Sequence, residues 1–190
     1  MPGAVLAHVA ADDAEGGEDG ILYDAMWDSA VLHVLMRAMA QGARLAGERG
    51  SLLASSTAAY QTIVPSDDPL PSRLLSMQQS NTTVKLGEEA VLKLYRRVQP
   101  GINPDWEIGR YLTGHGFSHS PAVGGAIEYV TSGESATVAL LQSYVRNEGD
   151  AWGETLKQLD GFLARASAQS PPGESDAGRD RLPWDLAQSP

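Results

Sequence analysis

A lysine inside an apolar segment is one candidate functional residue of this sequence. Lys93 lies in AVLKLY, a run of β-prone residues that ends at Tyr95. The alternation of a strand places Val91, Lys93 and Tyr95 on one face. A lysine in these surroundings either stands at an exposed edge of a sheet or points toward an anion.

A glutamate in the following helix is the candidate partner of that lysine. Asn103 suits the N-cap of this helix, and Pro104 suits its first position. The helix dipole favours carboxylates in the first turn, here Asp105 and Glu107, and this alone would explain Glu107. Because Lys93 precedes it on a strand, an ion pair between Lys93 and Glu107 is the second interpretation.

The elements around these residues predict an α+β fold. Thr82–Leu86 and Ala90–Tyr95 form a hairpin across a short turn, and AVGGAIEYV and TVALLQSYV are two further strands. We expect an antiparallel sheet of about five strands with the helix from Pro104 packed on it. WGETLKQLDGFLARA predicts another amphipathic helix. Upstream, the sequence predicts a helix with this apolar face: Trp27, Val31, Leu35, Ala38 and Met39.

The order of these parts is that of the N-terminal lobe of a protein kinase. Such a lobe uses a strand lysine to reach the nucleotide phosphates, a helix glutamate to hold that lysine, and a loop that covers the phosphates. Lys93 and Glu107 stand in the matching order along the chain.

The amino-acid sequences of several segments resemble those of the maltokinase family, including the maltokinase half of trehalose synthase–maltokinase fusions. The resemblance is carried by QQSNTTVKLGEEAVLKLYRRVQPGINPDWEIGRYL, GGAIEYV and ALLQSYVRNEGDAW, and it extends over about residues 20–165. It implies a kinase-like fold that uses Mg-ATP to phosphorylate maltose at the anomeric hydroxyl. The product, maltose 1-phosphate, would feed α-glucan and glycogen synthesis.

The resemblance also implies which residues bind the nucleotide. Lys93 matches the strand lysine that contacts the phosphates, and Glu107 matches its helix partner. The loop over the phosphates corresponds to Ser80, Asn81 and Thr82, whose hydroxyl and amide groups can donate to phosphate oxygens. The hinge, which contacts the adenine through backbone groups, corresponds to Gln142, Ser143, Tyr144 and Val145.

The sequence departs from the family where the chemistry should occur. Phosphoryl transfer needs an aspartate that receives the hydroxyl proton and side chains that hold the metal ions. None of the histidines opens an HGD-type loop, and no DFE- or DFG-like triplet occurs. We therefore expect no catalytic or metal-binding residue in this chain, no C-terminal lobe, and no maltokinase activity from the chain alone. ATP is the expected partner, maltose would bind only with the missing lobe, and a trehalose synthase domain or subunit is a further candidate partner.

A second hypothesis is a non-catalytic interaction module derived from the same fold. Its support is the polar tail at the end of the chain, whereas the combination of Lys93, Glu107 and the QSNT loop favours the kinase. A metal hydrolase has little support, because no His, Asp or Glu cluster has ligand spacing and His115 and His119 lie in a Gly-rich loop. We expect Trp152 and Trp184 to lie exposed in an apolar patch if they contact the absent lobe.

Composition limits the remaining possibilities. The formal charge of −10 excludes a nucleic-acid binder that acts through an overall basic field, and no segment resembles a signal peptide or a membrane span. The lack of Cys favours a reducing cytoplasm. The expected organisation is a flexible N-terminus (1–20), a partial cap subdomain (21–72), a kinase-like lobe (73–150), a helix (151–166) and a flexible tail (167–190).

Overall fold

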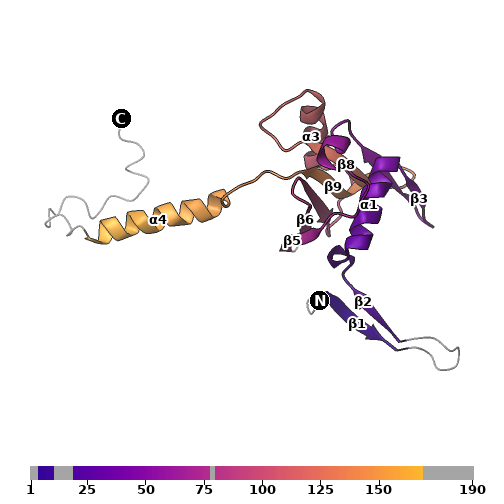
Figure 1. Cartoon of the computed structure of the whole chain (residues 1–190), viewed down its shortest axis with the longest axis horizontal. Coiled ribbons are helices and arrows are strands. Elements are labelled where there is room, and N and C mark those ends of the chain that lie inside the picture. Colours follow the sequence, from indigo (N-terminus) through magenta and orange to yellow (C-terminus); the bar gives the residue numbers. More distant parts are fainter. Residues whose placement is uncertain (1–3, 11–18, 78–79, 169–190) are drawn as a thin grey trace. The chain divides into compact units, whose positions relative to one another are not determined.

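The computed structural model of the chain describes residues 4–10, 19–77 and 80–168. These residues divide into two compact units that meet between Val145 and Arg146, and each unit is described by itself. The first unit holds the following elements (Figure 1): β1 (Val5–Val9), β2 (Gly20–Tyr23), a 3-10 turn η1 (Ala25–Trp27), α1 (Ser29–Gln41), β3 (Arg44–Ala46), β4 (Ser51–Ser56), α2 (Tyr60–Ile63), β5 (Ser72–Met77), β6 (Asn81–Leu86), β7 (Ala90–Tyr95), α3 (Pro104–Gly114), β8 (Val123–Val130) and β9 (Ser135–Ser143). The second unit holds α4 (Ala151–Ala168).

A seven-stranded sheet forms the centre of the first unit, in the order β3-β4-β8-β9-β7-β6-β5, with every neighbouring pair antiparallel. The α+β class and the antiparallel sheet are confirmed, but the expected number of about five strands was too small. The strands named from the sequence correspond to β6, β7, β8 and β9, and the sheet also contains β5 and, before the proline-rich segment 65–71, β3 and β4. Because β9 separates β7 from β8, the chain crosses over through α3 between two parallel strands.

The two faces of this sheet pack against different helices. Leu140 and Leu141 are neighbours in β9, and their side chains leave opposite faces of the strand. Leu141 belongs to the core that contains Leu32, Met36 and Met39 of α1. Leu140 belongs to a smaller cluster under α3: Trp106, Val123, Ala126, Leu140 and the half-buried Tyr95. The sheet is therefore covered by α1 on one face and by α3 on the other.

The caps of α1 explain where this helix begins and ends. The Asp28 side chain accepts a hydrogen bond from the backbone N–H of Ala30, and Gly42 ends the helix in the left-handed conformation, with a φ of 60°. The buried face is rotated from the predicted one. The buried residues are Leu32, Met36 and Met39; of the predicted apolar face, only Met39 is fully buried.

The N-terminal region contains two strands, β1 and β2, that the sequence analysis did not predict. Val5–Val9 pairs with β2 in a separate two-stranded ribbon, and the side chains of both strands are exposed. Residues 11–18, in the predicted flexible N-terminus, lie outside the described residues.

Strand β4, in the predicted cap subdomain, pairs with β8 of the predicted lobe, so both regions share one sheet. The five domain limits remain predictions.

The second unit confirms the helix predicted from residue 151. Its apolar side chains are exposed: Trp152, Leu156, Leu159, Phe162 and Leu163. Trp152, which is 70% exposed, behaves as expected, whereas Trp184 lies outside the described residues. No described helix combines the length and apolarity needed to cross a membrane.

Candidate functional site

A cleft of about 310 Å³ lies between α3 and the face of the sheet that this helix covers. Lys93 of β7 and Gln142 of β9 contribute polar side chains from the sheet. The remaining lining residues are Pro104, Asp105, Ile108, Gly109, Leu112, Ser120, Pro121 and Val123. This cleft contains the lysine and one hinge residue that the sequence analysis selected.

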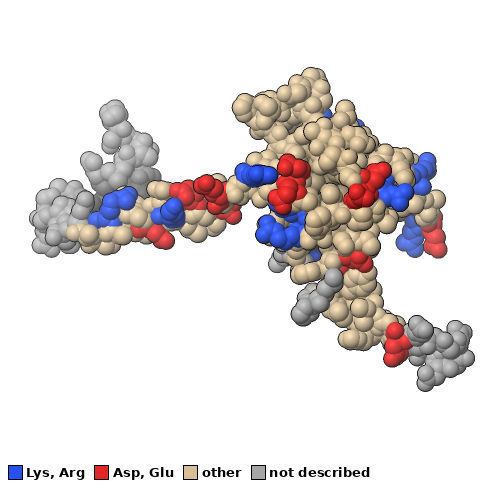
Figure 2. All heavy atoms as spheres, viewed as in Figure 1, with Lys and Arg blue, Asp and Glu red and all other residues tan. Residues whose placement is uncertain are grey.

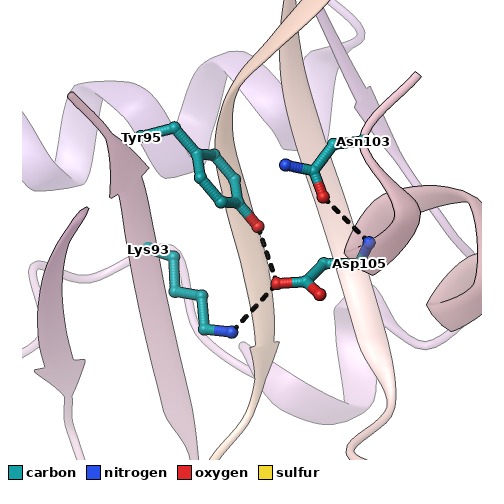
Figure 3. Close-up of polar contacts among 4 residues, drawn as sticks. All are labelled: Lys93, Tyr95, Asn103 and Asp105. Carbon is teal, nitrogen blue, oxygen red and sulfur yellow. Dashed lines mark hydrogen bonds and ion pairs between the residues drawn. The ribbon is translucent and has the colours of Figure 1, made fainter. Parts of the chain in front are cut away.

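Lys93 is held at the cleft by an aspartate at the start of α3. Its ammonium nitrogen lies 3.2 Å from Oδ2 of Asp105, and the hydroxyl of Tyr95 donates to the same oxygen at 3.0 Å (Figure 3). Lys93 and Tyr95 reach this oxygen together because residues two apart on a strand share a face. The Asn103 side chain accepts a hydrogen bond from the backbone N–H of Asp105 at 2.8 Å, which fixes the first turn of the helix.

The expected ion pair between Lys93 and Glu107 is wrong, because Asp105 takes that position. Successive residues of an α-helix are about 100° apart, so Asp105 and Glu107 point about 200° apart around α3. When Asp105 faces the strand, Glu107 faces away, and Glu107 is exposed. The helix dipole, the other interpretation of Glu107, still fits its place in the first turn.

The environment of Tyr95 keeps its hydroxyl protonated. Burial raises the pKa of Tyr95 well above its ordinary value of 10.0, and the charge of Asp105 and the hydrogen bond to it raise this pKa further. The hydroxyl is therefore a permanent donor to Asp105 at neutral pH. The Lys93 and Asp105 side chains are 29% and 52% exposed, so their attraction is screened by water. The ion pair orients Lys93 more than it stabilises the fold.

The predicted phosphate loop, Ser80 to Thr82, directly follows residues 78–79, which lie outside the described residues, and Asn81 and Thr82 begin strand β6. The carbonyl oxygen of Ser80 accepts from the backbone N–H of Arg96 at 2.8 Å. Asn81 is half-buried, opposite Tyr95 in the adjacent strand. Thr82 is fully buried, and its hydroxyl accepts from Nε of Arg96. Ser80, Asn81 and Thr82 are absent from the described lining of the cleft, so their role in phosphate binding remains a prediction.

The first residue of the predicted hinge lines the cleft, whereas the next two donate backbone hydrogen bonds to other parts of the protein. Gln142 lines the cleft. The backbone N–H of Ser143 donates to Ala122, and that of Tyr144 donates to Glu89 at 2.7 Å. These two N–H groups are therefore occupied within the protein. Val145 is 56% exposed, and the ammonium of Lys85 lies 4.5 Å from the centre of the Tyr144 ring.

The sequence analysis did not assign a role to Asp105 and Tyr95, the two residues that hold the Lys93 side chain in place. A local sequence feature of each residue could have indicated this role. Asp105 is the second residue after the Asn103 N-cap, and Tyr95 shares the strand parity of Lys93. The choice between Asp105 and Glu107 depends on the rotation of α3 about its axis. That rotation is set by burial of Trp106 against the sheet, which no residue spacing reveals.

Charge is mixed on the surface of the first unit. Figure 2 shows Lys and Arg side chains next to Asp and Glu side chains on the face that it draws. Within the described ranges, no group of three or more His, Asp or Glu side chains could hold a metal ion.

No protein-family model matches the chain.

Proposed function

We propose that the chain contains the nucleotide-binding lobe of a maltokinase-like sugar kinase, an enzyme that transfers phosphate from Mg-ATP to the anomeric hydroxyl of maltose. The observation that carries the proposal is Lys93, whose ammonium lies at a cleft of about 310 Å³ and is held by an acid from the adjacent helix. A cleft of this size is at the lower end of those that hold small ligands.

Lys93 would supply positive charge to the phosphates. An ammonium is a compact charge that binds phosphate without a fixed geometry, so its position must come from neighbouring groups. Asp105 and Tyr95 provide that position, and Ile108 and Leu112 of the same helix add apolar side chains to the lining of the cleft. Asp105 in this proposal has the place that kinases give to a helix glutamate.

Binding of a nucleotide would not suffice for transfer. A base for the sugar hydroxyl and ligands for the magnesium ions are needed, and the 190 residues contain neither an HGD-type loop nor a DFG-like triplet. We therefore propose that this polypeptide binds Mg-ATP weakly, that it does not phosphorylate maltose by itself, and that maltose binds only when a catalytic lobe is present.

Calorimetric titration of the full chain with Mg-ATP tests the proposal. Lys93→Met should weaken binding by about tenfold or more, because a hydrogen bond to a charged group contributes about 1.5–3 kcal/mol. Lys157→Met, at an exposed position of α4, removes the same charge outside the cleft and should leave binding unchanged. Equal binding by the chain and the Lys93 variant would contradict the proposal, and turnover of maltose with ATP would contradict the predicted inactivity.

The second candidate function is a non-catalytic interaction module, which the exposed apolar side chains of α4 favour. Exposed apolar surface of this kind marks contacts with other macromolecules. The same titration separates the two functions. No Mg-ATP binding by the chain would favour the module, and binding that depends on Lys93 would favour the kinase lobe.

A further inference from the structure

A small pocket of about 90 Å³ lies where the loop 97–103 meets the start of α3 and the sheet. It is distinct from the cleft at Lys93, with which it shares only Pro104. At about 30 Å³ per molecule in the liquid, the pocket has room for about three waters or one small ion. Its polar side chains come from β7, the loop, the N-cap of α3 and β9: Tyr95, Arg97, Gln99, Asn103 and Thr137.

A β-bulge turns Thr137 toward this pocket. Ala139 and Thr137 pair with consecutive residues of β8, so Val138 is one extra residue in β9. An extra residue reverses the face to which the residues beyond it point. Thr137 therefore lies on the face that α3 covers, with Leu140, whereas Ala139 points to the core on the opposite face.

The hydroxyl of Thr137 is buried without a partner. The residue is 3% exposed, and its Oγ1 makes no hydrogen bond to any group that the structure describes. A buried hydroxyl without a partner destabilises a fold, and valine, which has nearly the same shape, would avoid this cost. A polar side chain held in this way at the wall of a pocket points to a polar group inside the pocket.

The rest of the lining offers more donors than acceptors. The guanidinium of Arg97 has no ion-pair or hydrogen-bond partner in the described part of the chain. Asn103 uses its side-chain oxygen to accept from Asp105, and the amide nitrogen of Asn103 has no described partner (Figure 3). The described lining contains no acidic side chain. One cation and several unpaired donors around a buried hydroxyl favour an oxyanion.

Two acidic residues near the pocket limit its affinity for an anion. Asp105 follows Pro104 in the chain, but its carboxylate pairs with Lys93 at the other cleft. Glu128 is paired with Thr137 across β8 and β9; it is partly exposed and does not line the pocket. The charge of Glu128 and the net charge of −10 oppose an anion, so we expect binding in the millimolar range.

We propose that this pocket binds the phosphoryl group of inorganic phosphate or of a small phosphate ester. Thr137 and Asn103 donate to its oxygens, and the exposed Arg97 supplies the opposite charge from the solvent side. A phosphoryl group suits donors from three segments better than a planar carboxylate does, because its three terminal oxygens point in different directions. The pocket holds the phosphoryl group alone, and the organic part of an ester lies outside. This site does not depend on nucleotide binding at Lys93.

Nuclear magnetic resonance titration of the ¹⁵N-labelled full chain with sodium phosphate and with glycerol 3-phosphate tests the site, and sodium chloride at matched ionic strength is the blank. Either probe should shift the amide signals of residues 97–103 and 136–138. Thr137→Val should weaken binding by about tenfold, because a hydrogen bond to a charged group is lost. The same variant should unfold at no lower urea concentration than the original chain, because it removes an unpaired buried hydroxyl.

Three charge variants show whether the ligand is an anion and where it binds. Arg97→Gln should weaken binding by about fivefold, and Glu128→Gln should tighten it by about twofold. Arg49→Gln, at an exposed position between β3 and β4, removes the same charge as Arg97→Gln does and should bind as the original chain does. Lys93→Met should leave the shifts at residues 136–138 unchanged, because the two sites are separate.

Four outcomes would overturn the proposal. The first is the absence of shifts beyond those that sodium chloride causes, which would mean that the pocket holds only water. The others are unchanged binding by Thr137→Val, equal losses in Arg97→Gln and Arg49→Gln, and equally tight binding of sodium acetate at the same residues. If the proposal holds, tighter binding of glycerol 3-phosphate identifies an ester as the ligand, and tighter binding of inorganic phosphate identifies the free ion.

Discussion

Oδ2 of Asp105 lies 3.2 Å from the ammonium nitrogen of Lys93, and the same oxygen receives the Tyr95 hydroxyl at 3.0 Å. Two donors from one strand therefore converge on a single carboxylate oxygen of the helix that crosses above it. A half-exposed ion pair contributes about 0.2–1 kcal/mol to stability, so the main effect of the contact is to place the positive charge of Lys93.

The first prediction concerns the effect of this contact on nucleotide binding. Asp105→Asn should weaken Mg-ATP binding by about two- to fivefold, which is the factor that corresponds to an exposed ion pair. The reason is that Lys93 loses its fixed orientation and must be ordered when the ligand binds. Calorimetric titration measures the change.

Glu107→Gln is the matched control for that substitution, because it removes the same charge from the same helix turn but from a side chain that faces away from Lys93. It should leave Mg-ATP affinity within about twofold of the original value. Tighter binding by the Asp105 variant would mean that Asp105 repels the phosphates, and an effect at Glu107 alone would restore the pairing expected from the sequence.

The second prediction concerns alkaline pH. The folded-state pKa of Tyr95 is raised above the unfolded value of 10.0, so the stabilisation associated with its neutral hydroxyl is complete below pH 10.0 and is lost as the pH rises above it. Tyr95→Phe cannot ionise. The difference in unfolding free energy between the original chain and Tyr95→Phe should therefore shrink as pH rises past 10.0, as urea denaturation will report.

Tyr60 and Tyr23 also have raised pKa values, but both are present in the two proteins compared, and their contributions cancel in the difference. A Tyr95→Phe difference that stays constant across the alkaline range would refute the prediction.

Local sequence signals predicted much of the framework of the site. The Asn103–Pro104 pair located the start of α3, and the alternation in AVLKLY placed Lys93 and Tyr95 on one face. Both features depend on backbone preferences of neighbouring residues, which a single sequence displays directly. The partner of Lys93 depends on how α3 is rotated, and packing of Trp106 determines that rotation.

Long-range contacts account for the rest of what was missed. β4 joins the sheet beside β8, although more than sixty residues separate the two strands in the chain and prolines intervene. A proline-rich segment indicates a subdomain boundary because it interrupts helices and strands locally. It does not indicate which strands on its two sides pair with each other. The contact between Arg96 and Asp24 likewise joins residues that no local pattern connects.

The third prediction concerns Arg96, whose guanidinium joins the N-terminal region to the sheet. It donates to Asp24 at 2.6 Å and to the hydroxyl of the fully buried Thr82. Arg96→Met should lower the unfolding free energy by about 1–3 kcal/mol, because it leaves the Thr82 hydroxyl buried without its partner. Urea denaturation followed by circular dichroism measures the loss.

Two further variants separate this hydrogen bond from a general effect of charge. When Thr82→Val is already present, Arg96→Met should cost less than it does alone, because no hydroxyl remains to be left unsatisfied. Arg97→Met, at the exposed neighbouring position, should change stability by less than about 0.5 kcal/mol. Strictly additive losses at Thr82 and Arg96 would contradict the assigned bond.

The fourth prediction concerns the glycine that brings α3 close to the sheet beside the cleft. A Cβ atom added at Gly109 would lie 2.5 Å from Cγ2 of Val123, a β-branched and buried side chain that cannot rotate away easily. Gly109→Ala should therefore destabilise the chain by about 1–3 kcal/mol, despite the better helix propensity of alanine. Gly114→Ala, in the same helix, meets no atom within 4 Å and should be neutral or slightly stabilising. Thermal unfolding of both variants measures the difference, and equal stability of the two would show that α3 does not approach β8 this closely.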